Sequence, residues 1–257
     1  MSIHVHRFSL FDFIMSRREF FYAPPAQITD DEIQLIGDEH AHCARVLRKT
    51  TGDALTVVDG EGHAFDGVIS SVEKQRTLVR ITKRREAVGE PNTRLTLAQA
   101  VPKGNRFDWL IEKGTEVGVS SFIPLRCERS ETTAGDNKCE RWRRLGLAAM
   151  KQSCRSVLPS IESEKSFSEI CAAASSFDFA LLAEEGGVSI LDALEKYRGK
   201  KPRGLVIVGP EGGFSEAELQ TAANSGIRLF SLGPRRLRAE TAGLVAVTVM
   251  LSVLGES

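Results

Sequence analysis

From Arg94 to the C-terminus, short apolar runs alternate with stretches in which apolar residues recur at helical spacing. The runs RLTLAQAV, SFIPLRC, FALLA and GLVIVGP have the length and aliphatic content of buried strands. Within residues 107–117, positions that could share one helix face recur at helical spacing: Phe107, Leu110, Ile111, Gly114 and Val117. Residues 139–153 have a helical pattern as well. Because strands that alternate with helices form parallel sheets with helices on their faces, residues 92–257 are predicted to form an α/β domain.

The preceding segment, residues 15–88, has a β pattern instead. Between Ala54 and Arg85, runs rich in β-branched residues are separated by turns that contain Gly and Asp. Short antiparallel strands of this kind predict a small β-barrel. Residues 86–92 contain Gly and Pro without periodicity and form the natural boundary. We expect residues 1–14 to be a loose arm or an upstream mis-start, because Met15 opens the more ordinary beginning MSRREFF.

Composition limits the classes of function. Lys plus Arg and Asp plus Glu both number 34, so no net charge attracts the chain to nucleic acid or membrane. Residues 89–160 carry 12 basic and 8 acidic residues, which indicates a polyanion contact only weakly, since a solvated face is the commoner explanation. The longest apolar run, residues 244–254, is 11 residues long, whereas about 20 are needed to span a membrane. Five cysteines without a CxxC pair favour reduced thiols and a cytoplasmic location.

The first chemical motif is GLVIVGPEGGFSEAEL, residues 204–219. A buried strand is expected to end at Val208, and Ser215 with Glu218 forms an S-x-x-E capping box that starts a helix. Glycines in the intervening turn let the backbone approach a ligand closely and expose N–H groups near a helix N-terminus. The spacing matches neither a P-loop nor a GxGxxG motif, and Glu211 disfavours a phosphate ligand. A plain strand-to-helix turn remains an alternative.

The second motif is LFSLGPRRLRAETAGLVAVTVMLSVL, residues 229–254. A strand ends at a Gly-Pro turn, and three arginines then precede Glu240: Arg235, Arg236 and Arg238. Arginines at such a turn can grip a phosphate or polarise a base carbonyl through paired donors, although a solvated basic turn explains the charge equally well. The closing helix is apolar almost all round, so we expect it to be buried in the core or against a partner subunit.

Two other groups of residues are poor candidates for chemistry. His40, His42 and Cys43 have no second cluster at ligand spacing, and positions two apart on a helix do not face one side. We therefore predict no metal site. Cys127 and Cys154 are interpreted as small core residues rather than as thiol nucleophiles.

Taken together, the motifs resemble one family. GPEGGFSEAE, LGPRRLRAETA and QAVPKGNRFDWLIEKGTEVGV are similar to the bacterial 16S ribosomal RNA uridine-N3 methyltransferases, the ribosomal RNA small subunit methyltransferase E family of the SPOUT class. RREFF, HAHCARVLR, CERS and KQSCR add matches, so the resemblance runs in order from Arg17 to the C-terminus. Two positions depart from the family pattern, because Cys154 stands where Gly is usual and Arg236 where a hydrophobic residue is usual.

The resemblance implies a fold, a cofactor and an assembly. The expected fold is a PUA-like β-barrel RNA-binding domain at 15–88, followed at 92–257 by a SPOUT-type parallel sheet with a C-terminal trefoil knot. Family members hold S-adenosylmethionine in the knot loops and form homodimers. On this sequence the loops are residues 182–185, 209–213 and 232–237. The expected cofactor-binding residues are Leu182, Gly209, Pro210, Glu211, Gly212, Gly213, Leu232, Gly233 and Leu237.

The implied reaction is methylation of N3 of a specific uridine in small-subunit ribosomal RNA, within an assembled or assembling 30S particle. The N3 proton must leave, and arginine or backbone donors would stabilise the negative charge that then spreads onto O2 and O4. We expect Arg238 to polarise the uracil edge and Glu240 to orient it or accept the proton. A carboxylate that only faces the helix dipole is the alternative for Glu240.

RNA also has to be held through its phosphates and its splayed bases. The candidates are basic residues at positions that match the family: Arg17, Arg18, Arg45, Arg48, Lys103, Arg106, Arg129 and Arg155. For each of them a solvated or internally paired side chain is an open alternative. Two other functions also stay open: a SPOUT methyltransferase for another RNA, such as a transfer RNA ribose 2′-OH, and a non-catalytic ribosome-assembly factor.

Overall fold

The computed structural model describes residues 20–256, which form two compact units. The first unit extends to Gly89 and includes Lys151–Val157, and the second contains Glu90–Met150 and the chain from Leu158. The predicted arm at residues 1–14 lies outside the described residues. Residues 151–157 were expected in the α/β domain, but their backbone pairs with the first unit, where Ser156 N–H donates to Val88 O at 3.0 Å.

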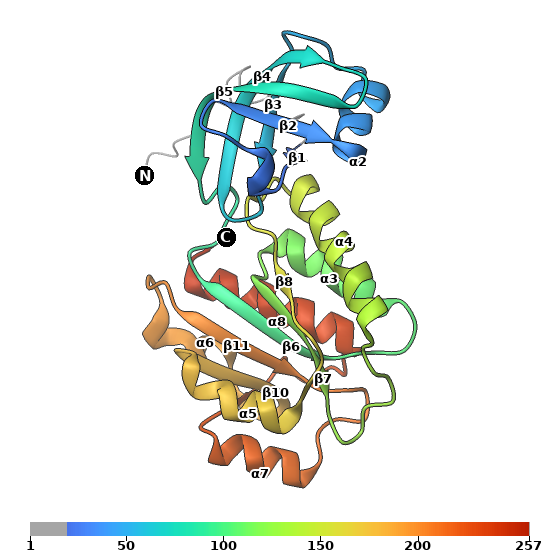
Figure 1. Cartoon of the computed structure of the whole chain (residues 1–257). Coiled ribbons are helices and arrows are strands. Elements are labelled where there is room, and N and C mark those ends of the chain that lie inside the picture. The colour runs from blue at the N-terminus through green and yellow to red at the C-terminus, as the bar shows by residue number, and fades with distance from the viewer. Residues whose placement is uncertain (1–19, 257) are drawn as a thin grey trace. The chain divides into compact units, whose positions relative to one another are not determined.

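The first unit is built on a five-stranded sheet (Figure 1). The strands are β1 (Phe20–Tyr22), β2 (Glu32–Ile36), β3 (Ala54–Val58), β4 (His63–Val72) and β5 (Arg76–Glu86). Their order is β1-β3-β4-β5-β2, with β1 parallel to β3 and the other pairs antiparallel. The register of β4 against β5 shifts twice, and Gly67 at the first shift has no room for a Cβ, which would lie 2.5 Å from the Val79 side chain. Such bulges curl a sheet.

Short helical segments complete this unit: η1 (Pro25–Gln27), α2 (Gly37–Ala41) and the π-helical turn η2 (His42–Val46). Its core contains the almost fully buried side chains of Phe21, Ile33, Leu35, Val57 and Val79. The β pattern between Ala54 and Arg85 is confirmed by β3, β4 and β5. We did not predict β1 and β2, because β1 has only three residues and β2 is a five-residue strand that includes Glu32 and Gln34.

The second unit contains a seven-stranded sheet in which every pair is parallel. The strands are β6 (Arg94–Ala100), β7 (Ser121–Arg126), β8 (Ser160–Ile161), β9 (Lys165–Ser166), β10 (Phe179–Val188), β11 (Arg203–Val208) and β12 (Arg228–Phe230). The order is β12-β10-β11-β6-β7-β8, and β9 pairs with β7. The sequence prediction of an α/β domain with a parallel sheet is therefore confirmed.

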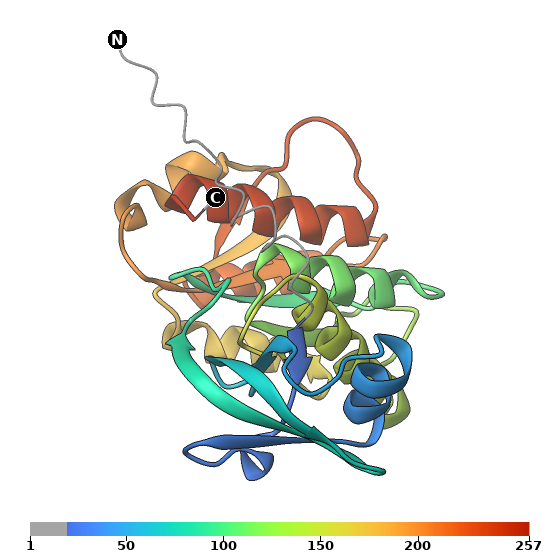
Figure 2. The same cartoon turned by 90° about the horizontal axis from the view of Figure 1, so that it is seen from above.

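Helices cover both faces of this sheet. They are α3 (Arg106–Val117), α4 (Asp136–Gln152), α5 (Phe167–Ala173), α6 (Ile190–Leu194), α7 (Glu216–Asn224) and α8 (Ala239–Leu254), with the 3₁₀ turns η3 (Ala174–Ser176) and η4 (Glu195–Tyr197). Helix α8 packs against α3 and α6 on one face, and α5 packs against α7 on the other (Figure 2). A hydrophobic core lies on each face of the sheet, and alternate residues of β11 point into one or the other. Val206 packs in the core on the α8 side, and Leu205 and Ile207 pack in the core on the α5 side.

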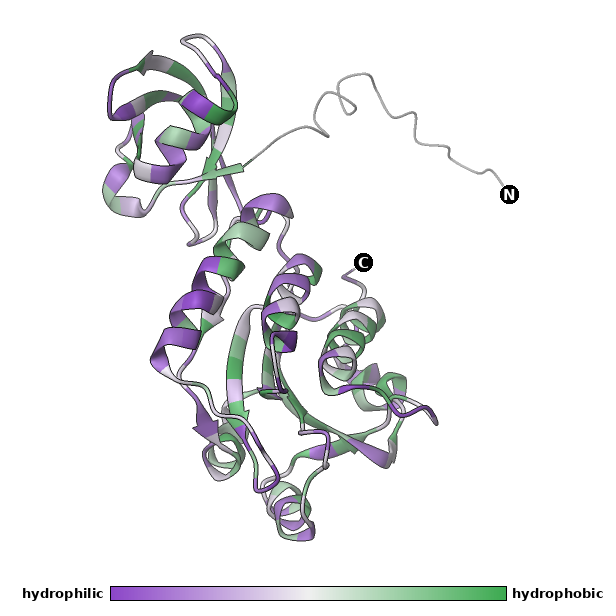
Figure 3. Ribbon diagram, turned by 90° about the vertical axis from the view of Figure 1, so that its right-hand side faces the viewer, coloured by the Kyte–Doolittle hydropathy of each residue, from purple (hydrophilic) through white to green (hydrophobic). Residues whose placement is uncertain are grey.

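The apolar C-terminal helix is largely buried. Its buried residues include Ala246, Val247, Met250 and Leu251, and hydrophobic residues also concentrate along the central strands (Figure 3). Val249 stays 38% exposed, so one side of α8 is open. Among residues 20–256, no helix is long and apolar enough to cross a membrane.

Candidate active site

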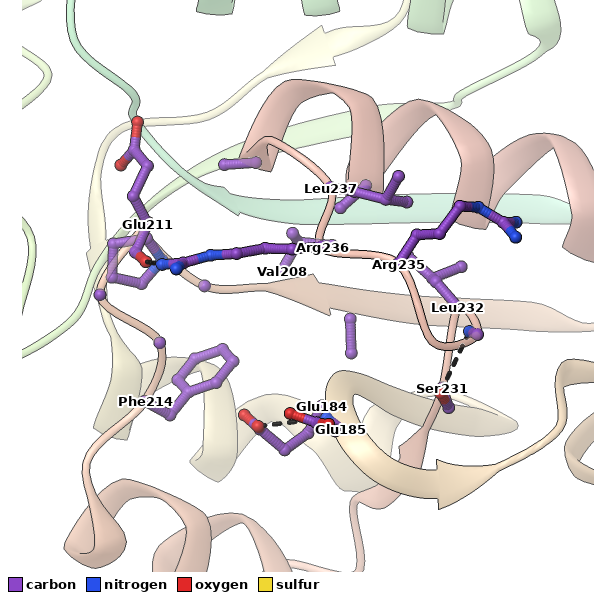
Figure 4. A pocket seen from close by; sticks show the side chains of 18 of the residues that line it. Glu184, Glu185, Val208, Glu211, Phe214, Ser231, Leu232, Arg235, Arg236 and Leu237 are labelled. Carbon is purple, nitrogen blue, oxygen red and sulfur yellow. Dashed lines mark hydrogen bonds between the residues drawn. The ribbon is translucent and has the colours of Figure 1, made fainter.

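A pocket of about 520 Å³ lies in the second unit, at the carboxyl ends of the neighbouring strands β10, β11 and β12. Its walls come from residues 183–185 in β10, 208–214 after β11 and 231–237 after β12, together with Ala239 and Ala242 of α8 (Figure 4). In open α/β sheets, ligands bind beyond the carboxyl ends of the strands. The pocket therefore has the position that this class of fold gives to a binding site.

The glycine loop, residues 209–213, has a shape that larger residues would disturb. A Cβ at position 209 would lie 2.8 Å from the Phe214 ring, which is itself buried against Phe167 with ring centroids 5.3 Å apart. Gly213 has φ +70°, and its N–H donates to Pro210 O at 2.9 Å. The loop is therefore a tight turn packed on an aromatic residue of the core.

The predicted capping box at the start of α7 is confirmed. Ser215 N–H donates to Glu218 Oε2 at 2.9 Å, and Glu218 N–H donates to Ser215 Oγ at 3.3 Å. The second carboxylate oxygen of Glu218 accepts the N–H of Glu128 at 2.9 Å, so the helix start is also joined to the segment that follows β7.

The pocket combines apolar walls with charges of both signs. Apolar surface comes from Val208, Phe214, Leu232 and Leu237. The acidic residues Glu184, Glu185 and Glu211 and the basic residues Arg235 and Arg236 also line the pocket, and the side chains of Arg235 and Arg236 point in opposite directions (Figure 4). Arg236 Nη2 donates to Glu211 O at 3.2 Å, which joins the loop after β12 to the loop after β11. Such a pocket suits a small organic ligand that has both an apolar part and polar or charged groups.

Eight of the nine expected cofactor-binding residues line this pocket: Gly209, Pro210, Glu211, Gly212, Gly213, Leu232, Gly233 and Leu237. Leu182 does not. It belongs to β10, and its side chain is fully buried in the core on the α5 side of the sheet. The pocket wall begins with the next residue, Ala183, where the register of β10 against β12 breaks.

The two expected catalytic residues lie beside the pocket at the start of α8. Arg238 is the exposed N-cap residue, and Glu240 is 8% exposed. The cation next to Glu240 is Arg106, whose Nε lies 3.8 Å from Glu240 Oε1, and Glu240 Oε2 is buried without a hydrogen-bond partner among the described residues. Gln99 Oε1 is likewise buried without one, and it lies so close to α8 that a Cβ at Gly243 would be 2.3 Å away.

Most of the expected RNA-binding residues of the second unit have internal partners. Lys103 forms an ion pair with Glu131, Arg106 Nη1 lies 3.5 Å from Glu211 Oε1, and Arg129 Nη1 donates to Gly212 O at 2.9 Å. These contacts were not predicted from sequence, because they depend on the order of the strands in the sheet.

The remaining RNA-binding candidates come from the N-terminal part of the chain or, like Arg155, from the segment 151–157 that belongs to the first unit. Arg45 and Arg48 are exposed on the first unit, whereas Arg17 and Arg18 lie outside the described residues. Arg155 is only 2% exposed, which favours the alternative of an internally paired side chain over a contact to RNA.

The cysteines have no features of a nucleophile. Burial, followed by the charge of Glu218, raises the pKa of the Cys127 thiol to about 12. Cys127 is a core residue as predicted, but Cys154 is half-buried and has φ +58°, a left-handed conformation that favours glycine. His40 Nδ1 lies 2.9 Å from Thr77 Oγ1, and no group of three His, Cys, Asp or Glu side chains in residues 20–256 is placed to hold a metal ion.

Two family models match the chain. One, described as an RNA methyltransferase domain, covers residues 89–251, and the other, described as an RNA methyltransferase PUA domain, covers residues 35–82. The first contains the pocket and all of α3, α7 and most of α8. The second lies within the curled sheet of the first unit.

Similar proteins agree with these matches. The chain is 32% identical to ribosomal RNA small subunit methyltransferase E of Synechocystis, in an alignment that covers 99% of this chain and 83% of the relative. It is 29% identical to the Bacillus subtilis protein of the same name, in an alignment that covers 92% of this chain and 93% of the relative. It superposes with a TM-score of 0.81 on a ribosomal RNA small subunit methyltransferase E from Neisseria gonorrhoeae bound to S-adenosyl methionine, at 27% identity, covering 92% of this chain and 98% of that one. The chain belongs to the ribosomal RNA small subunit methyltransferase E family of RNA methyltransferases.

Proposed function

We propose that the protein transfers the methyl group of S-adenosylmethionine to N3 of a specific uridine in small-subunit ribosomal RNA. The observation that carries the proposal is the pocket itself, which three loops of the methyltransferase domain form at one edge of the sheet. We propose that it acts in the cytoplasm on RNA of an assembled or assembling 30S particle.

The residues of the pocket fit this cofactor. Apolar side chains of Val208, Phe214 and Leu237 would cover the adenine, and the glycine loop would hold it through backbone groups. Glu184 and Glu185 supply negative charge for a cationic ligand. When bound, the cofactor supplies a methyl carbon that a nucleophile can attack.

Glu240 and Arg238 are the side chains that we propose for the base edge. Arg106 Nε lies 3.8 Å from Glu240 Oε1, and Oε2 is buried without a hydrogen-bond partner among residues 20–256. This unpaired oxygen would orient the uracil or accept the N3 proton once the base displaces the groups that cover it. The exposed guanidinium of Arg238 would donate to O2 or O4, where negative charge grows as the proton leaves.

The remaining features of the family are proposals for this chain as well. The C-terminal segment would form a trefoil knot, as the resemblance to the family implies. A homodimer would cover the exposed side of α8, where Val249 lies. Arg45 and Arg48, together with Arg17 and Arg18, would hold RNA phosphates.

Binding of S-adenosylmethionine tests the enzymatic reading first. A ligand at about 100 times its dissociation constant stabilises the fold by about 2.7 kcal/mol, so thermal denaturation should shift upward with saturating cofactor. A ribosome-assembly factor without catalytic function would show no such shift. A methyltransferase for another RNA would show the shift but would not label small-subunit RNA.

A further inference from the structure

The glycine loop of the pocket is held from outside by the segment that follows β7, residues 127–130. Arg129 Nη1 donates to Gly212 O at 2.9 Å. The stem of this arginine also lies over Gly212, since a Cβ built there would be at ordinary contact distance, 3.5 Å, from both Cβ and Cδ of Arg129. The guanidinium and the aliphatic stem of one side chain therefore both meet a single glycine of the pocket.

The backbone that carries Arg129 is itself fixed. Cys127 N–H donates to Ser130 Oγ at 2.9 Å, and Glu128 N–H donates to Glu218 Oε1 at 2.9 Å. Glu218 is 9% exposed and caps the helix that follows the glycine loop. Residues 127–130 therefore hold the loop at Gly212 and the helix start immediately after it, and we call them the 127–130 brace.

The bond from Arg129 acts on a peptide unit that defines the turn. Gly212 C=O and Gly213 N–H belong to one planar group, and that N–H donates to Pro210 O at 2.9 Å. Two hydrogen bonds at opposite ends of a planar unit fix its orientation, and each polarises the other. The brace therefore determines how the backbone of residues 212 and 213 lies in the pocket wall.

We propose that Arg129 is a positioning residue for the cofactor pocket rather than a contact to RNA. The inference rests on the proposed function, because it assigns the pocket to S-adenosylmethionine. Without the side chain, the Gly212–Gly213 peptide keeps only the bond from Gly213 N–H to Pro210 O, so its orientation is less restricted. The apparent affinity for the cofactor then falls in proportion to the fraction of molecules in which the loop is competent to bind. Lysine cannot replace it, because an ammonium lacks the planar, delocalised guanidinium that is both donor and packing surface.

The test uses the full-length protein and three variants: Arg129→Ala, Arg129→Lys and the control Arg126→Ala. Arg126 lies three residues earlier in β7, is 59% exposed, and is paired with Glu164 rather than with the glycine loop. Hydrogen exchange of peptides that cover 209–214 is measured without cofactor, titration calorimetry gives the dissociation constant for S-adenosylmethionine, and fluorescence anisotropy gives the affinity for a small-subunit RNA fragment.

Both Arg129 variants should speed exchange of the glycine loop. They should also weaken cofactor binding by about five- to tenfold, as expected if about a tenth to a fifth of the molecules keep the loop competent. Their RNA affinity, and all properties of Arg126→Ala, should stay within about twofold of the wild type. Unchanged loop exchange, or an RNA affinity that falls in Arg129→Ala and returns in Arg129→Lys, would overturn the proposal. A wild-type protein that does not bind S-adenosylmethionine would instead contradict the proposed function, and loop exchange would still decide the role of Arg129.

Discussion

Arg106 Nε lies 3.8 Å from Glu240 Oε1, so a cation from the start of α3 holds one oxygen of a buried carboxylate at the start of α8. The same arginine reaches Glu211 in the pocket loop, with Nη1 3.5 Å from Oε1. Glu240 therefore has one oxygen within ion-pair distance of a cation and a second, buried oxygen without a hydrogen-bond partner among the described residues.

Glu240→Gln tests the chemical role of this carboxylate. The amide keeps the size of the side chain but cannot accept a proton, so turnover should fall by more than about tenfold, or about 1.4 kcal/mol in the barrier. Single-turnover methyl transfer gives the rate, and calorimetry should find cofactor affinity unchanged. A loss of less than tenfold would discard Glu240 as the base.

Gly209→Ala should damage the pocket through packing. The new Cβ would lie 2.8 Å from the Phe214 ring, which cannot withdraw because it packs against Phe167. We expect a loss of about 1–3 kcal/mol in the free energy of unfolding and weaker cofactor binding. The matched control is Gly135→Ala, where nothing lies within 4 Å of the added Cβ. Urea denaturation should separate the two variants, and equal stabilities would contradict the packing account.

Gly89→Ala should destabilise the first unit. Gly89 has φ +70°, and a Cβ there would lie 2.6 Å from Cys154 O, a backbone atom of the returning segment. Strain and clash together should cost about 1–3 kcal/mol in the free energy of unfolding. Gly52→Ala separates the two causes, because Gly52 has φ +97° but nothing within 4 Å. If chemical denaturation gives the same loss in the free energy of unfolding for both variants, the clash with Cys154 contributes nothing.

Glu256→Gln should reveal a pH-dependent contribution to stability. Burial alone would raise the pKa of Glu256, but hydrogen bonds from Asn92 and Thr93 lower it overall from the ordinary 4.5. The carboxylate therefore stabilises the fold fully above about pH 4.5, the pKa of the unfolded state, and this stabilisation is lost as the pH falls through the lowered pKa of the folded state. At pH 7 the free energy of unfolding of the variant should be about 1 kcal/mol lower than that of the wild type. Denaturation at descending pH should show the difference from wild type shrinking below 4.5, and a constant difference would contradict the assignment.

The convergence of two pocket loops could be predicted from sequence. Gly- and Pro-containing turns follow the apolar runs that end at Val208 and Phe230, and the carboxyl ends of parallel strands meet at one edge. The capping box of Ser215 and Glu218 could also be predicted, since it depends on residues three apart. Both features are local or follow from the fold class.

The contacts between distant segments could not be predicted in this way. Because β11 lies between β10 and β6, Arg106, which follows β6, reaches Glu211, which follows β11. No periodicity encodes that order of strands. The burial of Arg155 likewise depends on residues 151–157 joining the first unit, where Cys154 turns the chain with φ +58°.

The proposed methylation of a uridine at N3 is tested most directly by methyl transfer from labelled S-adenosylmethionine to small ribosomal subunits that lack the modification. Methylation at N3 blocks the pairing edge of the base, so reverse transcription should stop at one new position, a uridine. Glu240→Gln serves as the control, with little label and no stop. Label without a stop would contradict the claim by indicating a 2′-O or C5 product, and no label despite cofactor binding would show that small-subunit RNA is not the substrate.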